Sequence, residues 1–391
     1  MKNLFNHTPE GVRDIYNGEY MKKLYVKNNL FDTLYSFGYM PIDTPTFEYF
    51  DTFSKEVGTT ASNELYKFFD REGNTLVLRP DITPSIARAA AMYFNEDDTP
   101  TRLCYSGNVF VNHHSHQGRM DESTQIGGEL IGDSSEEADS EILALCVNGL
   151  KKVGISDFLI SVGHVDICQG LIEAAKLDDD ATEQLLNLIE NKNFYGMVEL
   201  LESYKIPANL IDLFSVLNQM YSKPADFAEV KERSRAYTKV YNAFCYLEKL
   251  YDLLEAYGVT DFISIEPGLH TNFKYYTGIV FAGYTYEYGE PILKGGRYDK
   301  LLSHFGPELP AIGLAYYVDA LCAAIERQKV KVEYDNKIEV IVYKKDQYKT
   351  AVAKGAQLRA TGKRVMLVPD NNSLTDDNYK TAYSNVEVVR L

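Results

Sequence analysis

The sequence has few cysteines, no long apolar segment and a shortage of positive charge. Its five cysteines are odd in number and widely scattered, and none belongs to a Cys-x-x-Cys pair, a pattern that favours reduced thiols over disulfides or a zinc site. No apolar run approaches the roughly 20 residues that span a bilayer. The first residues also lack the apolar core of a signal peptide. We therefore expect a cytoplasmic protein that makes no membrane contact.

The charge balance is acidic. Lysine and arginine together number 40, against 56 aspartate and glutamate residues, which gives a formal net charge of −16. General nucleic-acid binding depends on neutralising phosphates, so nucleic acid is an unexpected partner, and the balance favours a protein partner or a small ligand. At 391 residues the chain has room for one large domain and one small domain.

Periodic apolar residues predict a mixed α and β chain. Residues 180–257 stand out because they are rich in leucine, poor in glycine and helical in period, and we expect a helical insertion at about 178–257. Other predicted helices cover 20–37, 136–153 and 313–327, and predicted strands cover 40–47, 103–110, 124–131, 158–162, 262–265, 275–281 and 291–295. The main domain is expected to span 1–328, followed by a charged linker and a small α/β unit at 337–391, with strands over 338–343, 364–368 and 386–389 and a helix over 347–360.

The most informative stretch is Lys294-Gly295-Gly296-Arg297-Tyr298-Asp299, which follows Tyr275-Tyr276-Thr277-Gly278. A glycine pair lets the backbone approach a ligand or another strand closely. Arg297 is compatible with ligand binding and also with a structural ion pair to a carboxylate such as Asp299. The two tyrosines belong to the predicted strand 275–281, so their side chains are expected to point to opposite faces, with at most one lining a pocket.

Five further segments accompany this stretch, in order: 8–14, 38–48, 78–83, 110–129 and 310–315. Together, over about residues 8–328, they resemble class II aminoacyl-tRNA synthetase paralogues of the histidyl-tRNA synthetase type. The resemblance implies an α+β fold in which a mainly antiparallel sheet is flanked by helices. It also implies a homodimer through 38–48, which is similar to the motif 1 of that family, and a truncated anticodon-domain-like unit at 337–391.

The chain departs from the family where ATP chemistry should occur. The family's arginines correspond to Val111, Thr271 and Ala320, an acidic residue corresponds to His113, and a glycine beside the adenine corresponds to Tyr317. Adenylate formation relies on cations that stabilise charge developing on phosphate, and the loss of one such group typically costs on the order of 10²–10³ in rate. We therefore expect no catalytic residue and no cofactor.

The amino-acid side of the site is retained. Gln125, Gly127 and Glu129 alternate along a predicted strand and face one side, with the glycine leaving room between two polar side chains. Alternatively, Gln125 and Glu129 form a hydrogen bond with each other that has a structural role. The resemblance implies a histidine-binding set of Asp81, Thr83, Arg119, Gln125, Glu129, Tyr275 and Tyr276. His113, His114 and His116 lack a carboxylate or cysteine to complete a metal site, so we expect a solvated loop and no metal.

A histidyl-type core that keeps an amino-acid pocket and loses ATP chemistry resembles the regulatory subunits of ATP phosphoribosyltransferase. This resemblance implies a non-catalytic chain that joins a short-form catalytic subunit in a hetero-oligomer, activates the first step of histidine biosynthesis and transmits feedback inhibition by L-histidine. Two alternatives remain open: a truncated histidyl-tRNA synthetase, and a non-catalytic paralogue that senses tRNA or an amino acid.

Overall fold

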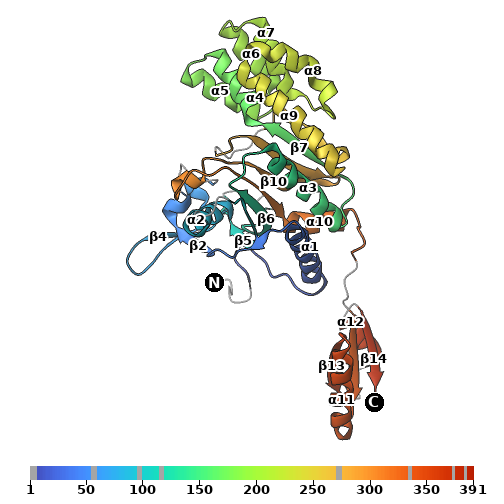
Figure 1. Cartoon of the computed structure of the whole chain (residues 1–391). Coiled ribbons are helices and arrows are strands. Elements are labelled where there is room, and N and C mark those ends of the chain that lie inside the picture. Colours follow the sequence, from blue (N-terminus) through green and yellow to red (C-terminus); the bar gives the residue numbers. More distant parts are fainter. Residues whose placement is uncertain are drawn as a thin grey trace. The chain divides into compact units, whose positions relative to one another are not determined.

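The computed structural model describes residues 7–53, 60–94, 99–113, 119–269, 275–332, 337–371, 375–382 and 385–391. The chain divides into two compact units (Figure 1), one made of Met1–Asp14 and Val26–Lys331 and the other of Ile15–Tyr25 and Val332–Leu391. Each unit has its own sheet and its own hydrophobic core.

An eight-stranded sheet forms the centre of the larger unit. Its strands, in their order across the sheet, are β1 (Met40–Pro41), β5 (Thr101–Phe110), β6 (Glu122–Ile131), β11 (Ala311–Tyr317), β10 (Tyr288–Arg297), β9 (Ile279–Thr285), β7 (Phe158–His164) and β8 (Ile263–Ile265). Neighbouring strands are antiparallel except at the two edges, where β1 pairs with β5 and β7 with β8 in parallel. The mainly antiparallel sheet expected from the sequence is thus confirmed.

Helices flank this sheet, and a small second sheet lies beside it. The helices of this part are α1 (Asn17–Ser36), α2 (Thr83–Tyr93), α3 (Glu136–Lys152) and α10 (Val318–Arg327), and the small antiparallel sheet has β2 (Phe47–Tyr49), β4 (Thr75–Leu78) and β3 (Lys67–Phe69). Helix α3 begins where the Ser135 side chain accepts a hydrogen bond from the Ala138 backbone N–H, an N-cap. The Tyr316 hydroxyl donates to the Leu145 carbonyl at 2.6 Å, so α3 packs against β11.

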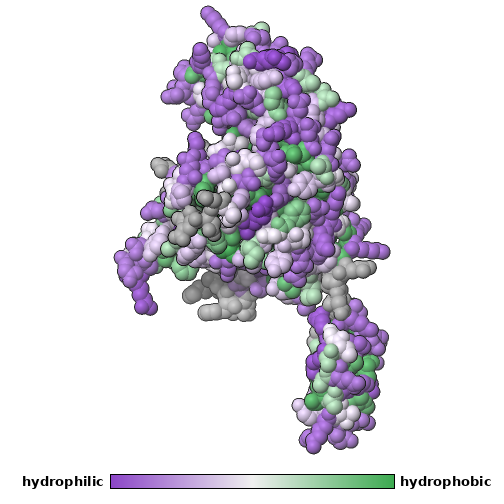
Figure 2. All heavy atoms as spheres, in the orientation of Figure 1, coloured by the Kyte–Doolittle hydropathy of each residue, from purple (hydrophilic) through white to green (hydrophobic). Residues whose placement is uncertain are grey.

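The segment after β7 is helical, as the leucine pattern predicts. It contains α4 (Val165–Ala175), α5 (Asp179–Glu190), α6 (Phe194–Ser203), α7 (Ala208–Phe214), α8 (Pro224–Arg233) and α9 (Thr238–Tyr257). Val240, Phe244, Leu247 and Leu254 form the buried stripe of α9. On the face drawn in Figure 2 these helices present mainly hydrophilic side chains, as expected of amphipathic helices with one buried stripe.

The smaller unit contains a parallel three-stranded sheet with β12 in the middle. Its elements are β12 (Ile338–Tyr343), α11 (Tyr348–Ala360), β13 (Arg364–Pro369), α12 (Asp376–Ala382) and β14 (Val386–Arg390), with β13 and β14 on either side of β12. Val340, Val342 and Tyr379 form its core. Short 3₁₀ helices lie elsewhere in the chain, at Phe50–Phe53, Ser62–Glu64, Ser215–Asn218, Ser234–Ala236, Thr260–Phe262, Leu302–His304 and Lys345–Gln347.

Three secondary-structure predictions are wrong in part. The helix expected over 313–327 begins only at Val318, because Gly313 to Tyr317 belong to β11, a strand buried on both faces whose apolar run does not distinguish strand from helix. The strand expected over 275–281 begins at Ile279. The strand expected over 40–47 reduces to Met40–Pro41 and a new strand from Phe47, since a proline cannot donate to a ladder.

Two further observations concern the described residues. No helix among them combines the length and the apolar character that a membrane crossing requires. None of the five cysteines, all of which lie in described parts of the chain, forms a disulfide, and Cys104 and Cys146 are buried.

Candidate functional site

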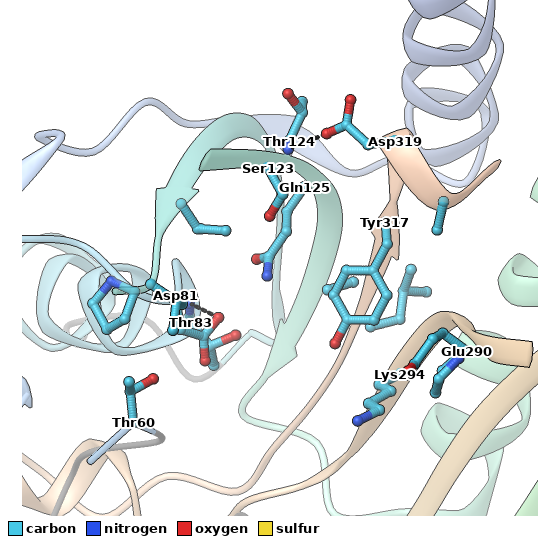
Figure 3. Close-up of a pocket in the computed structure, with 18 of the residues that line it drawn as sticks. Thr60, Asp81, Thr83, Ser123, Thr124, Gln125, Glu290, Lys294, Tyr317 and Asp319 are labelled. Carbon is cyan, nitrogen blue, oxygen red and sulfur yellow. Dashed lines mark hydrogen bonds between the residues drawn. The ribbon is translucent and has the colours of Figure 1, made fainter. Parts of the chain in front are cut away.

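A cavity of about 880 Å³ lies in the larger unit, on one face of the central sheet (Figure 3). Its floor comes from β6, β11 and β10, and the start of α2 forms a wall. All seven residues predicted to bind histidine line it: Asp81, Thr83, Arg119, Gln125, Glu129, Tyr275 and Tyr276. Four of the positions that differ from the ATP-binding pattern line the same cavity, namely Val111, His113, Tyr317 and Ala320. The fifth, Thr271, lies outside the described residues.

Strand register explains why the floor is hollow. Gln125 on β6 lies opposite Tyr317 on β11, and Glu129 lies opposite Gly313. Directly opposed residues of an antiparallel pair point to the same face. A side chain at Gly313 would overlap the Glu129 carboxylate, so only glycine leaves room for that group. Gly313 is therefore the glycine that leaves the floor open at Glu129, whereas the Tyr105 ring fills the space that Gly127 was expected to leave.

Glu129 is the buried acid of the cavity. It is 1% exposed, and its carboxylate accepts hydrogen bonds from the Thr83 hydroxyl at 2.9 Å and the Tyr298 hydroxyl at 2.5 Å. Burial raises the pKa of Glu129 to about 8, although these two hydrogen bonds act in the opposite direction. The group is consequently protonated at neutral pH when nothing cationic faces it.

Gln125 is not the partner of Glu129, so the structural hydrogen-bonded pair considered from the sequence is absent. Its side-chain carbonyl oxygen is buried and has no hydrogen-bond partner among the described residues. A buried amide oxygen without a partner costs free energy unless a ligand donor completes it. In Figure 3 the amide of Gln125 points into the cavity, toward the side of Asp81 and Thr83.

Asp81 precedes α2 and lies at the wall of the cavity. Its carboxylate accepts from the Ile82 backbone N–H at 2.7 Å, which orients the side chain at the start of the helix. Pro84 follows at the first helical positions, where its missing N–H is harmless. The segment 78–83 thus forms a strand-to-helix turn that carries two of the predicted ligand-binding residues, Asp81 and Thr83.

Both tyrosines of the Tyr275–Tyr276 pair line the cavity, which corrects the expectation that at most one does. They precede β9 and are not part of a strand, so strand alternation does not apply to them. Their ring centroids lie 4.7 Å apart, and Tyr275 also packs edge-on against Tyr298 at 5.9 Å. The three rings make an aromatic wall beside Glu129.

Arg119 lies in the cavity lining but remains exposed to solvent. Its guanidinium pairs with the Glu290 carboxylate at 3.1 Å, and both side chains are about 60% exposed (60% and 62%). An exposed pair of this kind contributes little binding energy. The structure therefore separates Arg119 from the buried polar end formed by Thr83, Gln125 and Glu129.

The end of the cavity opposite to the Glu129 carboxylate contains Tyr317, Asp319 and Ala320. The ring of Tyr317 projects into the cavity (Figure 3), and burial raises the pKa of its hydroxyl. Ala320 is buried in the first turn of α10. The Asp319 carboxylate accepts from the Thr124 backbone N–H at 2.7 Å, which fixes the helix start against β6.

Arg297 has the structural role that the sequence left open. It is 5% exposed and does not line the cavity. Its guanidinium donates to the Asp139 carboxylate at 2.9 Å and to the Asp299 carboxylate at 3.1 Å. The Tyr246 hydroxyl completes the group by donating to Asp139 at 2.6 Å. This buried network joins β10, α3 and α9 behind the floor of the cavity.

Sequence reasoning gave no role to several residues that line the cavity. Tyr298 and Lys294 both belong to the Gly-Gly stretch. Because residues two apart in a strand share a face, alternation from Gly296 would have placed both side chains on the cavity face of the sheet. Arg13, Glu290 and Arg327 reach the cavity from three separate segments, which no local pattern predicts. Among the residues that the structure describes, no group of three or more His, Cys, Asp or Glu side chains is arranged to hold a metal ion; His114 and His116 lie outside them.

The chain is similar to known proteins of one family. The family model for histidyl-tRNA synthetase matches residues 11–321. An ATP phosphoribosyltransferase regulatory subunit of Acetivibrio thermocellus is 34% identical over 356 residues, which cover 91% of this chain and 85% of the relative. One from Ruminiclostridium cellulolyticum is 36% identical, covering 90% of this chain and 84% of the relative.

Solved structures show the same relationship. A protein of Bacillus halodurans C described as an ATP phosphoribosyltransferase regulatory subunit/histidyl-tRNA synthetase superposes with a TM-score of 0.85 at 31% identity, over 99% of both chains. Histidyl-tRNA synthetase from Nostoc sp. shares the fold, with a TM-score of 0.80 at 19% identity, over 96% of this chain and 88% of that one. The resemblance drawn from the motifs is confirmed. This chain belongs to the family of histidyl-tRNA synthetase-like ATP phosphoribosyltransferase regulatory subunits.

Proposed function

We propose that this chain has no catalytic activity of its own and activates a short-form ATP phosphoribosyltransferase catalytic subunit, to which it transmits feedback inhibition by L-histidine. One observation carries the proposal: the cavity combines a built polar end around Glu129 with an opposite end where Val111, Tyr317 and Ala320 carry no charge. Recognition of an amino acid needs the first end, whereas adenylate chemistry needs cations at the second.

In this proposal L-histidine is held by Asp81, Thr83, Gln125, Glu129, Tyr275 and Tyr276, with Arg119 at the solvent side. The unpartnered amide oxygen of Gln125 accepts a ligand N–H, and Glu129 becomes ionised when it faces a ligand cation. Tyrosine rings supply a flat wall for an imidazole. Support comes from the position of all these side chains around one cavity.

The bound ligand signals to the partner through thermodynamic linkage between ligand binding and the state of the assembly. A ligand changes activity only if it binds two assembly states with different affinity, and coupling free energies of about 1–3 kcal/mol are typical. We propose that the chain forms a homodimer through the region similar to motif 1, within a larger hetero-oligomer of the cytoplasm. Exposed apolar side chains on the edge strand and the small sheet support this, among them Met40, Phe47 and Tyr49.

The experiment is an assay of phosphoribosyl-ATP formation by the short-form catalytic subunit from the same genome, with and without this chain, across a titration of L-histidine. The proposal predicts activity that rises when the chain is added and falls with L-histidine. The Glu129→Ala variant should keep the activation and lose the inhibition, because the cavity lies within the chain and Glu129 is buried. No effect of the well-folded wild-type chain on the catalytic subunit would contradict the proposal.

A further inference from the structure

Lys294 contributes a cationic side chain to the same cavity. It lies on β10 opposite Ala315 of β11, which in turn lies opposite Gly127 of β6. Directly opposed residues share a face of the sheet, so the lysine shares the face that carries Gln125 and Glu129. Figure 3 shows its side chain extending into the cavity beside the Tyr317 ring.

The other cations of the cavity are engaged. Arg119 pairs with Glu290 at 3.1 Å. Arg327 donates to the Glu287 carbonyl at 3.0 Å and lies over the Tyr288 ring at 5.3 Å. Arg13 also has an interaction partner. In the part of the chain that the structure describes, Lys294 makes no hydrogen bond or ion pair through its ammonium group.

This ammonium group is held in a partly desolvated position. Burial lowers the pKa of Lys294. The Glu290 carboxylate acts in the opposite direction, and the Arg119 guanidinium lowers this pKa further. A charged group that has lost water without gaining a partner is costly. An anionic ligand group at this position would restore the lost interaction through a charge-assisted hydrogen bond.

The space beside the lysine suits one part of an amino acid. Ala315, which lies opposite Lys294 on β11, is small and lines the cavity. Asp81 and Glu129 place carboxylates at the other side of the cavity. A zwitterion therefore finds acids at one side for its ammonium or ring N–H and a cation at the other side for its carboxylate.

We propose that Lys294 binds the α-carboxylate of the amino acid held in this cavity and thereby selects amino acids over the corresponding amines. The proposal rests on the proposed function, because it concerns the ligand of the same site, and it adds the residue that recognises the carboxylate. The proposed interaction is a contact between the Lys294 ammonium group and the ligand's α-carboxylate.

The test compares two probes that differ in that carboxylate alone, L-histidine and histamine. Each is titrated calorimetrically into the full chain, as wild type and as the Lys294→Met variant, which keeps most of the aliphatic stem. We expect wild type to prefer L-histidine and the variant to bind it about 10- to 100-fold more weakly, the range for a hydrogen bond between charged groups. Histamine affinity should be the same in both proteins, so the preference disappears.

Two further variants sharpen the result. Lys294→Arg keeps the charge and should retain part of the preference, although its planar head differs in geometry. Lys300→Met removes an exposed lysine just after β10 and should leave both affinities unchanged.

The outcomes separate this inference from the proposed function. If Lys294→Met weakens L-histidine and histamine equally, or weakens neither, the lysine does not recognise the carboxylate, while the histidine site itself stands. If wild type binds neither probe, the proposed function is overturned and this inference with it.

Discussion

The two ends of the cavity differ in the way their side chains are supported. At the polar end, Glu129 receives hydrogen bonds from Thr83 and Tyr298 and is almost fully buried. At the other end, Tyr317 fills space with a ring, and Val111 and Ala320 offer no polar group. A preorganised polar group retains its geometry for a ligand, whereas Val111, Tyr317 and Ala320 supply no cation for a phosphate. This difference supports the proposal that the sheet keeps amino-acid recognition without adenylate chemistry.

Behind the floor lies the network of Arg297, Asp139 and Tyr246, and it gives the largest expected effect. Replacing one partner of a buried ion pair leaves the other charge uncompensated, which typically costs about 3–5 kcal/mol. Arg297→Leu should therefore lower the free energy of unfolding by about that amount, measured by chemical denaturation. The double variant Arg297→Leu/Asp139→Leu should recover part of the loss. A loss below about 1 kcal/mol in the single variant would show that the network adds little.

The second prediction concerns the polar end directly. Glu129→Gln keeps the size of the side chain and removes its ability to ionise, so affinity for L-histidine should fall by about 100-fold, as expected for a lost charged hydrogen bond in a buried site. Calorimetric titration measures this fall. Phe68→Leu, a change in the small sheet outside the cavity, is the control and should bind L-histidine like wild type. Equal affinity in wild type and Glu129→Gln would exclude Glu129 as the ligand's anchor.

The third prediction is a dependence of stability on pH. Burial raises the pKa of Glu129 to about 8, above its ordinary value of 4.5. A raised carboxyl pKa contributes stability that is fully present below the unfolded-state pKa and is lost as the pH rises through about 8. The free energy of unfolding should thus fall between about pH 4.5 and pH 8 in wild type and level off above pH 8, and this decline should be absent from Glu129→Gln. Parallel pH profiles would contradict the burial assigned to this acid.

The smallest effect is expected at the solvent side. Arg119 and Glu290 form an exposed pair, and such pairs contribute about 0–1 kcal/mol. Arg119→Met should change the affinity for L-histidine by at most about threefold, measured in the same titrations. A loss as large as that of Glu129→Gln would mean that Arg119 moves inward when the ligand binds.

Sequence reasoning predicted the parts of this site that depend on local pattern. Alternation around Gly127 placed Gln125 and Glu129 on one face, whereas Asp81 and Thr83 came from the resemblance of segment 78–83 to the histidyl-tRNA synthetase family. It did not predict the hydrogen bond from Tyr298 to Glu129, because those residues are 169 positions apart and only the pairing of β6, β11 and β10 brings them together.

The wrong predictions likewise concern features that the local sequence pattern does not determine. The strand of Gly313 to Tyr317 is buried on both faces, and a short apolar run followed by a helix has no distinguishing period. The tyrosine pair lies in a turn before β9, where alternation has no meaning. The ion pair of Arg297 with Asp299, which the sequence suggested, is present, whereas its pair with Asp139 joins β10 and α3, which the sequence does not show to be neighbours.

In the most direct test, L-histidine and ATP are titrated separately into the isolated chain. Histidine-dependent exchange of pyrophosphate into ATP is then assayed. If the proposed function is right, L-histidine binds, ATP with magnesium gives no binding heat, and no exchange occurs. Histidine-dependent exchange at a rate above that of a blank would contradict it, because the nucleotide end would then be functional despite Val111, Tyr317 and Ala320.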